Sequence, residues 1–178
     1  MSGSSASSRR THCSSAASRP TCCRPARRTG WGVLAWSPLA GGWLTGRWRR
    51  DAAQASSHRT RTMPFSHTLA HYDLSVPANQ AKLDAATALA GIADEAGLTL
   101  IQLALAFVTT HPAVTAAIIG PRTAAHLHDQ LQAADVVLTS DVLDRIDQVV
   151  APGTDVNPHD ASYGAAVLAD PRRRRRAA

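Results

Sequence analysis

The sequence lacks any hydrophobic run near the roughly 20 apolar residues that a membrane-spanning helix needs. It also has little cysteine: Cys13, Cys22 and Cys23 all lie in the first 25 residues, and their spacing matches no zinc site. A membrane protein, a disulfide-rich protein and a cysteine-based metal protein are therefore excluded. We expect no membrane partner and a cytoplasmic location, where thiols stay reduced.

Acidic residues are absent from residues 1–50, which contain nine arginines, and a further five arginines form residues 172–176. Residues 51–171 hold all 13 acids, so the net charge of +6 arises at the two ends of the chain. No run of aromatic residues accompanies either basic end, and the pattern does not favour nucleic-acid binding. Lysine occurs only once among the 19 basic residues, a bias that GC-rich coding DNA can produce.

Composition divides the chain into three parts. Residues 1–29 are rich in Ser, Arg and Ala without apolar periodicity, which predicts disorder because too little apolar surface can be buried. An organellar transit peptide and a wrongly chosen start or reading frame are the alternative interpretations. Residues 30–152 have the pattern of a folded domain, and residues 153–178 are predicted to be coil with a basic tail.

The middle part predicts an α/β fold. Two strands alternate with helices, and this order is typical of a parallel sheet. A capping box at Thr99 and Gln102 marks one helix start. The irregular residues 48–76 are a candidate lid. The predicted strands are 32–36 and 114–119, and the predicted helices are 77–96, 100–110, 124–133 and 140–150.

Both predicted strands end in a turn with few side chains. After the first come Ser37, Pro38, Leu39, Ala40, Gly41 and Gly42; after the second comes Gly120-Pro121-Arg122-Thr123, which leads into a helix N-terminus. Helix N-termini favour anions, and the Arg122 guanidinium matches phosphate geometry. We interpret the two turns as binding one polyanionic ligand across neighbouring strand ends; the alternative is that each is an ordinary connection.

Sites of other kinds find no support. His126 and His128 are two residues apart on a predicted helix and face different sides, so they cannot share a metal ion as an i, i+4 pair can. The sequence has no Ser-His-Asp order, no P-loop and no GxGxxG motif. We assign no metal site.

GVLAWSPLAGGWLTGR, LTLIQLALAFV and HPAVTAAIIGPRTAAHLHDQL, in this order, resemble the C-terminal part of aldo/keto reductases, in the branch that includes potassium-channel beta-subunit-like proteins. The resemblance runs from about Gly30 to Pro152. It implies an incomplete (β/α)8 TIM barrel with the C-terminal strands and helices only. It also implies NADP(H) as cofactor and an aldehyde or ketone as the small-molecule substrate of a full-length parent. In such a barrel the loops after the last two strands commonly bind phosphate.

The resemblance also implies roles for individual residues. Trp36 corresponds to the aromatic residue against the nicotinamide. His126 stands where the family often has Gln or Arg, and Gln130 where it usually has Asn. Ser37, Pro38, Leu39, Ala40, Gly41, Gly42 and Arg47 correspond to the pyrophosphate group, and Gly120, Arg122, His126, Asp129 and Gln130 to the group around the adenosine and its 2′-phosphate.

The family's catalytic Asp, Tyr, Lys and His lie on segments that would precede Gly30. The two tyrosines, Tyr72 and Tyr163, fall outside any matching motif. We therefore assign no catalytic residue and expect no reductase activity from the chain alone. A noncatalytic module that binds NADP(H) or pairs with another barrel fragment is the alternative. The expected core comprises Leu103, Phe107, Val114, Ile118 and Ile146.

Overall fold

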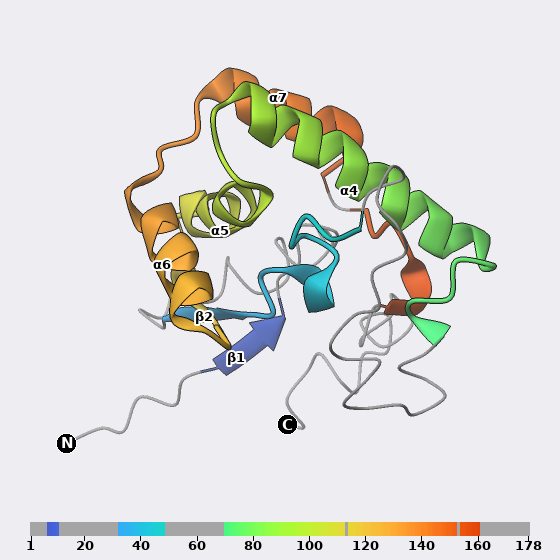
Figure 1. Ribbon diagram of the computed structural model, residues 1–178, viewed down its shortest axis with the longest axis horizontal. Coiled ribbons are helices and arrows are strands. Elements are labelled where there is room, and N and C mark those ends of the chain that lie inside the picture. Colours follow the sequence, from blue (N-terminus) through green and yellow to red (C-terminus); the bar gives the residue numbers. More distant parts are fainter. Residues whose placement is uncertain (1–6, 11–31, 49–69, 113, 153, 161–178) are drawn as a thin grey trace, which may run out of the picture.

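The structure, a computed structural model, describes residues 7–10, 32–48, 70–112, 114–152 and 154–160 (Figure 1). The predicted helices and strands of the middle part are confirmed, with ends within one or two residues. The strands are β1 (Ser7–Arg10), β2 (Val33–Trp36) and β3 (Val114–Ile118); the α-helices are α4 (Pro77–Glu95), α5 (Leu100–Thr110), α6 (Ala124–Gln132) and α7 (Ser140–Val149); the short 3-10 helices are η2 (Ala40–Gly42), η3 (Ala133–Asp135) and η4 (Pro158–Asp160).

The strands form one parallel sheet in the order β1-β2-β3, which confirms the expected parallel arrangement. β1 was not expected: Ser7 pairs with Val33 and Arg10 with Trp36. The prediction of disorder is wrong for these four residues, because pairing along a strand edge uses backbone groups and requires no apolar side chain. The other residues of 1–29, and most of the candidate lid, lie outside the described residues.

The β2–β3 ladder contains an irregularity at Thr115. Val33 is opposite Val114, whereas Leu34 is opposite Ala116. At this step the Val33 N–H donates to the Thr115 hydroxyl oxygen over 3.1 Å. A Cβ on Gly32 would approach that same oxygen to 3.1 Å, so the absence of a side chain at Gly32 allows the contact.

The helix starts agree with the sequence signals. Thr99 and Gln102 form the expected capping box: the Gln102 N–H donates to the Thr99 hydroxyl (3.1 Å), and the Thr99 N–H donates to the Gln102 side chain (3.0 Å). Thr123 caps α6 and Thr139 caps α7 in the same way, each through its hydroxyl. Side-chain oxygens thus satisfy N–H groups that a helix leaves without acceptors.

The main core lies between the sheet and the helices. Of the expected core residues, Leu103 and Ile146 are buried, and Phe107 and Val114 pack against the cluster. Ile118 is 41% exposed, so its assignment to the core is wrong. It lies on β3, whose side chains alternate irregularly between half-buried and exposed, and β3 pairs only with β2 among the described residues.

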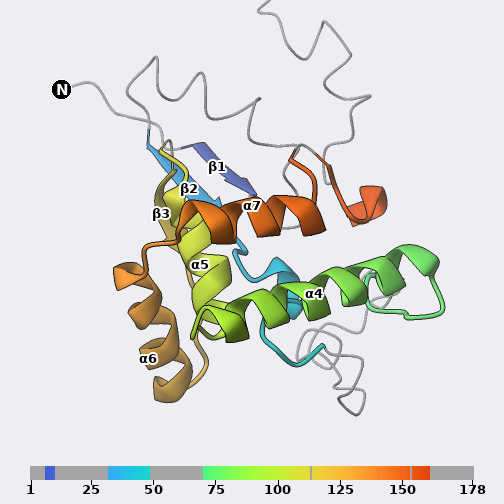
Figure 2. The same ribbon diagram turned by 90° about the horizontal axis from the view of Figure 1, so that it is seen from above.

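The helices lie on the side of the sheet that Figure 2 shows below and beside the strands. α5 packs against β3 and against α6, while α4 and α7 lie side by side in both views. Within the described residues no single helix is long and apolar enough to cross a membrane; α4 and α5 together pass that test by length and composition, with a bend of 93° between them.

Candidate functional site

The sheet brings the two predicted turns to one edge. β2 and β3 are adjacent and parallel, and Trp36, the last residue of β2, is opposite Ile118, the last residue of β3. The first turn (Ser37–Gly42) and the second turn (Gly120–Thr123) therefore start from neighbouring strand ends. The carboxyl edge of a parallel sheet is where ligands commonly bind.

The first turn is closed by its own hydrogen bonds. Its backbone N–H groups, which a polyanionic ligand would need as donors, donate within the turn instead. The N–H groups of Ala40, Gly42, Trp43 and Leu44 donate to carbonyls of the turn, at 2.8–3.4 Å, and the N–H of Gly41 donates to the Ser37 hydroxyl at 3.3 Å. The turn can use these N–H groups for a ligand only by opening.

The first turn also contains left-handed backbone at residues other than glycine. Ser37 has φ 57° and Ala40 has φ 50°, followed by Gly41 at 69° and Gly42 at 108°. Left-handed conformation costs an L-residue roughly 1–2 kcal/mol. Two such residues persist only where surrounding contacts determine the conformation, an arrangement common at ligand sites.

Side chains of the first turn divide between the core and the surface. Pro38 is buried and Leu39 packs against the main core, so their side chains anchor the turn. Trp36 is half-buried and Arg47 is exposed. A Cβ placed on Gly42 would meet no described heavy atom within 4 Å, and this part of the backbone faces open space.

The second turn presents a positive charge at a helix start. Arg122 is exposed, and the Thr123 hydroxyl accepts from the His126 N–H at 3.2 Å. The N–H groups of the first helical turn precede the first intrahelical bond and favour an anion. Gly120, like Gly42, has open space where a Cβ would lie. This backbone and side-chain set fits a phosphate.

The remaining residues predicted to surround the adenosine and its 2′-phosphate lie along α6. His126 is half-buried, and the Asp129 carboxylate accepts from the Thr99 hydroxyl at 3.1 Å, tying α6 to the start of α5. Gln130 is 8% exposed, and among the described residues its Oε1 has no hydrogen-bond partner. A buried amide oxygen without a donor costs about 1–3 kcal/mol.

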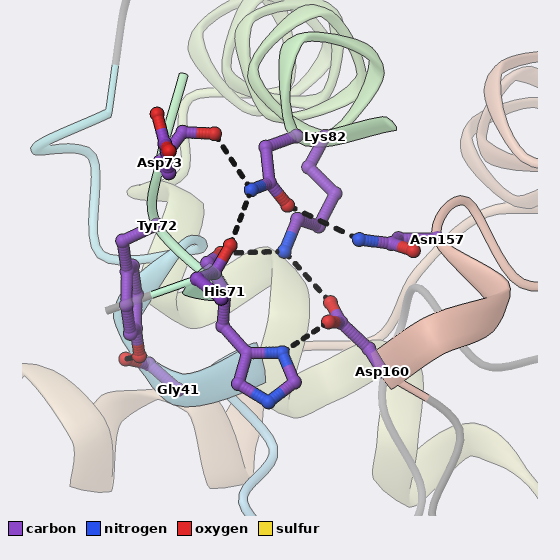
Figure 3. A network of polar contacts seen from close by, with 9 residues as sticks. Gly41, His71, Tyr72, Asp73, Lys82, Asn157 and Asp160 are labelled. Atoms are coloured by element: carbon purple, nitrogen blue, oxygen red, sulfur yellow. Dashed lines mark hydrogen bonds and ion pairs between the residues drawn. The ribbon is translucent and has the colours of Figure 1, made fainter. Parts of the chain in front are cut away.

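A polar network beside the first turn was not predicted (Figure 3). Lys82 of α4 is 5% exposed, and its ammonium donates to the His71 carbonyl and the Asp160 carboxylate, both at 2.7 Å. His71 also contacts that carboxylate through its ring. Burial lowers the pKa of Lys82, and Asp160 partly opposes this. A signal was present: Asn79 and Lys82 occupy the apolar face of an amphipathic helix, where a polar side chain needs a buried partner.

This network contains Asp, Tyr, Lys and His, the four residue types of the catalytic tetrad that the resemblance implies. Lys82 and His71 both contact Asp160, while the Tyr72 hydroxyl donates to the Gly41 carbonyl at 2.7 Å. A tyrosine that acts as a general acid has to deliver its proton to the substrate. Tyr72 directs its proton to the backbone, which indicates a structural use.

A small cavity lies between the network and the first turn. Ala40, Trp43, Lys82, Ala85 and Asp160 contribute to its lining, and its volume is about 60 Å³. Small-molecule pockets usually measure roughly 300–1,000 Å³, so a dinucleotide does not fit there. In the described part of the chain, no three His, Cys, Asp or Glu side chains are grouped so that they could hold a metal ion.

Comparison with known proteins identifies the family. The sequence model of the Aldo/keto reductase family matches residues 13–151. The chain belongs to the aldo/keto reductase family. The match starts upstream of Gly30, where the resemblance was expected to start, so part of the Ser/Arg-rich segment falls within it. The expected resemblance is otherwise confirmed.

The similar proteins include the expected branch of this family. A probable voltage-gated potassium channel subunit beta from Arabidopsis thaliana is 35% identical over 127 residues, which cover 68% of this chain and 36% of that protein. The uncharacterized oxidoreductase YrpG from Bacillus subtilis (strain 168) is 33% identical over 124 residues, which cover 70% of this chain and 33% of that protein. A putative voltage-gated potassium channel subunit beta from Schizosaccharomyces pombe (strain 972 / ATCC 24843) is 29% identical over 123 residues, which cover 68% of this chain and 34% of that protein. The chain spans about one third of the length of these relatives.

Proposed function

We propose that this chain supplies the NADP(H)-holding part of an aldo/keto reductase that acts on aldehydes or ketones. The observation that carries the proposal is the meeting of two turns at neighbouring strand ends, one with bare backbone at Gly42 and one with Arg122 at a helix N-terminus. Family membership and the likeness to an oxidoreductase support it. When bound, NADPH supplies a hydride.

The residues of the two turns bind and orient the dinucleotide. Arg122 and the N-terminus of α6 neutralise a phosphate, in the manner of other helix N-termini. Because the N–H groups of the first turn are used internally, that turn contributes shape, and Arg47 contributes charge. Gln130 accepts a hydrogen bond from the adenine amine, which would satisfy its buried Oε1. Trp36 covers the nicotinamide from the end of β2.

We further propose that the chain by itself does not reduce carbonyl compounds. The described residues form a three-stranded sheet, whereas a complete barrel has eight strands and typically about 250 residues. A noncatalytic role in which the chain binds NADP(H) and pairs with another barrel fragment is the second candidate. The exposed Ile118 on β3 favours it.

The test is a titration of the chain with NADPH and with NADH, followed by tryptophan fluorescence. We expect saturable quenching, tighter for NADPH, and an affinity about 10-fold to 100-fold weaker in Arg122→Ala, since a charge-assisted hydrogen bond is lost. Arg145→Ala is the matched control, because Arg145 pairs with Glu95 away from both turns. Absence of saturable binding by the wild-type chain would refute cofactor binding.

Activity is measured in the same preparations. NADPH oxidation with a panel of aldehydes and ketones should show no turnover above the Arg122→Ala background. Turnover that disappears in Arg122→Ala would refute the proposed inactivity. Turnover that Tyr72→Phe abolishes even at saturating NADPH, where weaker cofactor binding does not limit the rate, would instead show Tyr72 to be the general acid.

A further inference from the structure

Tyr72 ties the first turn to a segment distant in sequence. The Tyr72 hydroxyl donates to the carbonyl of Gly41, the residue between the left-handed Ala40 and Gly42. The Tyr72 ring stacks on Trp43, just after the turn, with centroids 5.8 Å apart and planes 9° apart. Tyr72 therefore contacts the turn directly beside Ala40, one of its two left-handed residues other than glycine.

The position of Tyr72 is set by α4. Asn79, which is fully buried, donates from its side-chain amide to the carbonyls of Ala70 (2.8 Å) and Asp73 (2.7 Å). Lys82, one helical turn later, donates to the carbonyl of His71 (2.7 Å). Three carbonyls around Tyr72 are thus held by two buried side chains of one rigid helix.

The same two side chains are held in turn by the C-terminal segment. Asp160 accepts from the Lys82 ammonium and also contacts His71, and Asn157 donates to the Asn79 side-chain oxygen at 3.1 Å (Figure 3). The Lys82 ammonium lies 4.7 Å from the centroid of a Trp43 ring. A carbonyl, a carboxylate and an aromatic face thus surround the Lys82 ammonium. This arrangement suits a compact charge and does not suit a planar guanidinium.

We propose that Tyr72 and Lys82 are positioning residues that hold the first turn in its cofactor-binding conformation. Lys82 and Asn79 fix residues 70–73, and Tyr72 transmits this to Gly41. The cofactor affinity of the turn consequently depends on residues about 30 to 120 positions away in sequence. The inference rests on the proposed function, because it concerns how the same turn is prepared for NADP(H).

Two roles of the network can be distinguished by the behaviour of the first turn in the folded protein. If it only adds stability, variants lower the free energy of unfolding and leave the turn and its affinity unchanged in the folded protein. If it positions the turn, a variant that removes the tie loosens the turn while the molecule remains folded. Hydrogen exchange at the backbone N–H groups of residues 42–44 reports this directly, because those groups donate within the turn.

The experiment compares Tyr72→Phe, which keeps the ring and removes the hydroxyl, with Lys82→Met and the wild-type chain. We expect exchange at residues 42–44 to be at least threefold faster in both variants, and NADPH affinity to be about threefold to tenfold weaker, as loss of one hydrogen bond implies. Arg145→Met is the control: it removes a polar tie between α7 and α4 that does not reach the turn. It should change neither quantity.

The experiment distinguishes failure of the proposed function from failure of this inference. If the wild-type chain binds no NADPH, the proposed function fails, and the exchange rates still decide whether Tyr72 holds the turn. If the wild-type chain binds NADPH and Tyr72→Phe matches it in both exchange and affinity, the inference is overturned. Should Lys82→Met fail to fold, Tyr72→Phe decides alone.

Discussion

At the scale of single residues, Lys82 shows why residue identity matters more than charge. The chain uses arginine at 18 of its 19 basic positions and lysine only here. An ammonium can be buried between a carbonyl and a carboxylate because it offers three separate donors on a flexible stem. Burial still disfavours the charged form, and the pKa of Lys82 is lowered below its ordinary value of 10.5.

This lowered pKa predicts a pH dependence of stability. Between the pKa of Lys82 in the folded protein and 10.5, the unfolded chain binds more protons than the folded chain, so the free energy of unfolding rises with pH. Urea denaturation at several pH values from 7 to 10 measures it. The free energy of unfolding of the wild type minus that of Lys82→Met isolates the contribution of Lys82, and this value should rise with pH. A value that stays constant or falls would contradict the prediction.

Gln130 gives a second prediction at this scale. Its Oε1 is buried without a partner among the described residues, so replacing the amide by an apolar side chain of similar length removes a desolvation penalty. Gln130→Met should raise the free energy of unfolding by about 1 kcal/mol, measured by urea denaturation, and should weaken NADPH binding. Gln148→Met, at an exposed position of α7, is the control and should do neither. A destabilised Gln130→Met would show that the amide has a partner.

At the scale of elements, the junction of β2 and β3 positions the site. The irregular pairing at Thr115 shifts the register by one residue, so that Trp36 is opposite Ile118 and not opposite Ala117. Both turns then begin at the same level of the sheet. The contact that marks this shift, from the Val33 N–H to the Thr115 hydroxyl, depends on a side-chain oxygen that valine lacks.

Thr115→Val, which keeps the shape and removes the oxygen, should therefore lower the free energy of unfolding by about 0.5–1.5 kcal/mol. Thr87→Val is the matched control. The Thr87 hydroxyl donates to the Leu83 carbonyl within α4, where the helix supplies a backbone donor as well, so the loss should be smaller. Equal losses in the two variants would argue against a special role of the irregular pair.

At the scale of the whole molecule, the described residues form an open sheet with helices packed against it. Ile118 on β3, Leu127 and Leu131 on α6, and Val137 after η3 are all large apolar residues with 40–90% exposure. Parallel sheets are ordinarily covered on both faces, and an uncovered strand edge favours association. These residues leave apolar surface exposed on β3, on α6 and after η3.

We expect the chain to associate with itself through these exposed apolar residues. The double variant Ile118→Lys and Leu131→Glu should lower the apparent mass at micromolar concentration, measured by light scattering, because charge on an edge strand and on an exposed apolar face opposes pairing. Ser140→Glu with Asp144→Lys, on exposed positions of α7, changes charge elsewhere and should leave the mass unchanged. A wild-type chain that is monomeric under these conditions would contradict the expectation.

The sequence by itself determined the local structure and the two turns. Apolar periodicity, three threonine caps and glycine positions specify helix and strand ends through neighbours within a few residues, and those ends were confirmed. The sheet pairing of Ser7–Arg10 and the exposure of Ile118 depend on segments brought together in space. The Tyr72, Lys82 and Asp160 network likewise joins residues up to 89 positions apart in sequence. The helical pattern marks Asn79 and Lys82 as buried, but their partners are set only when distant segments pack together.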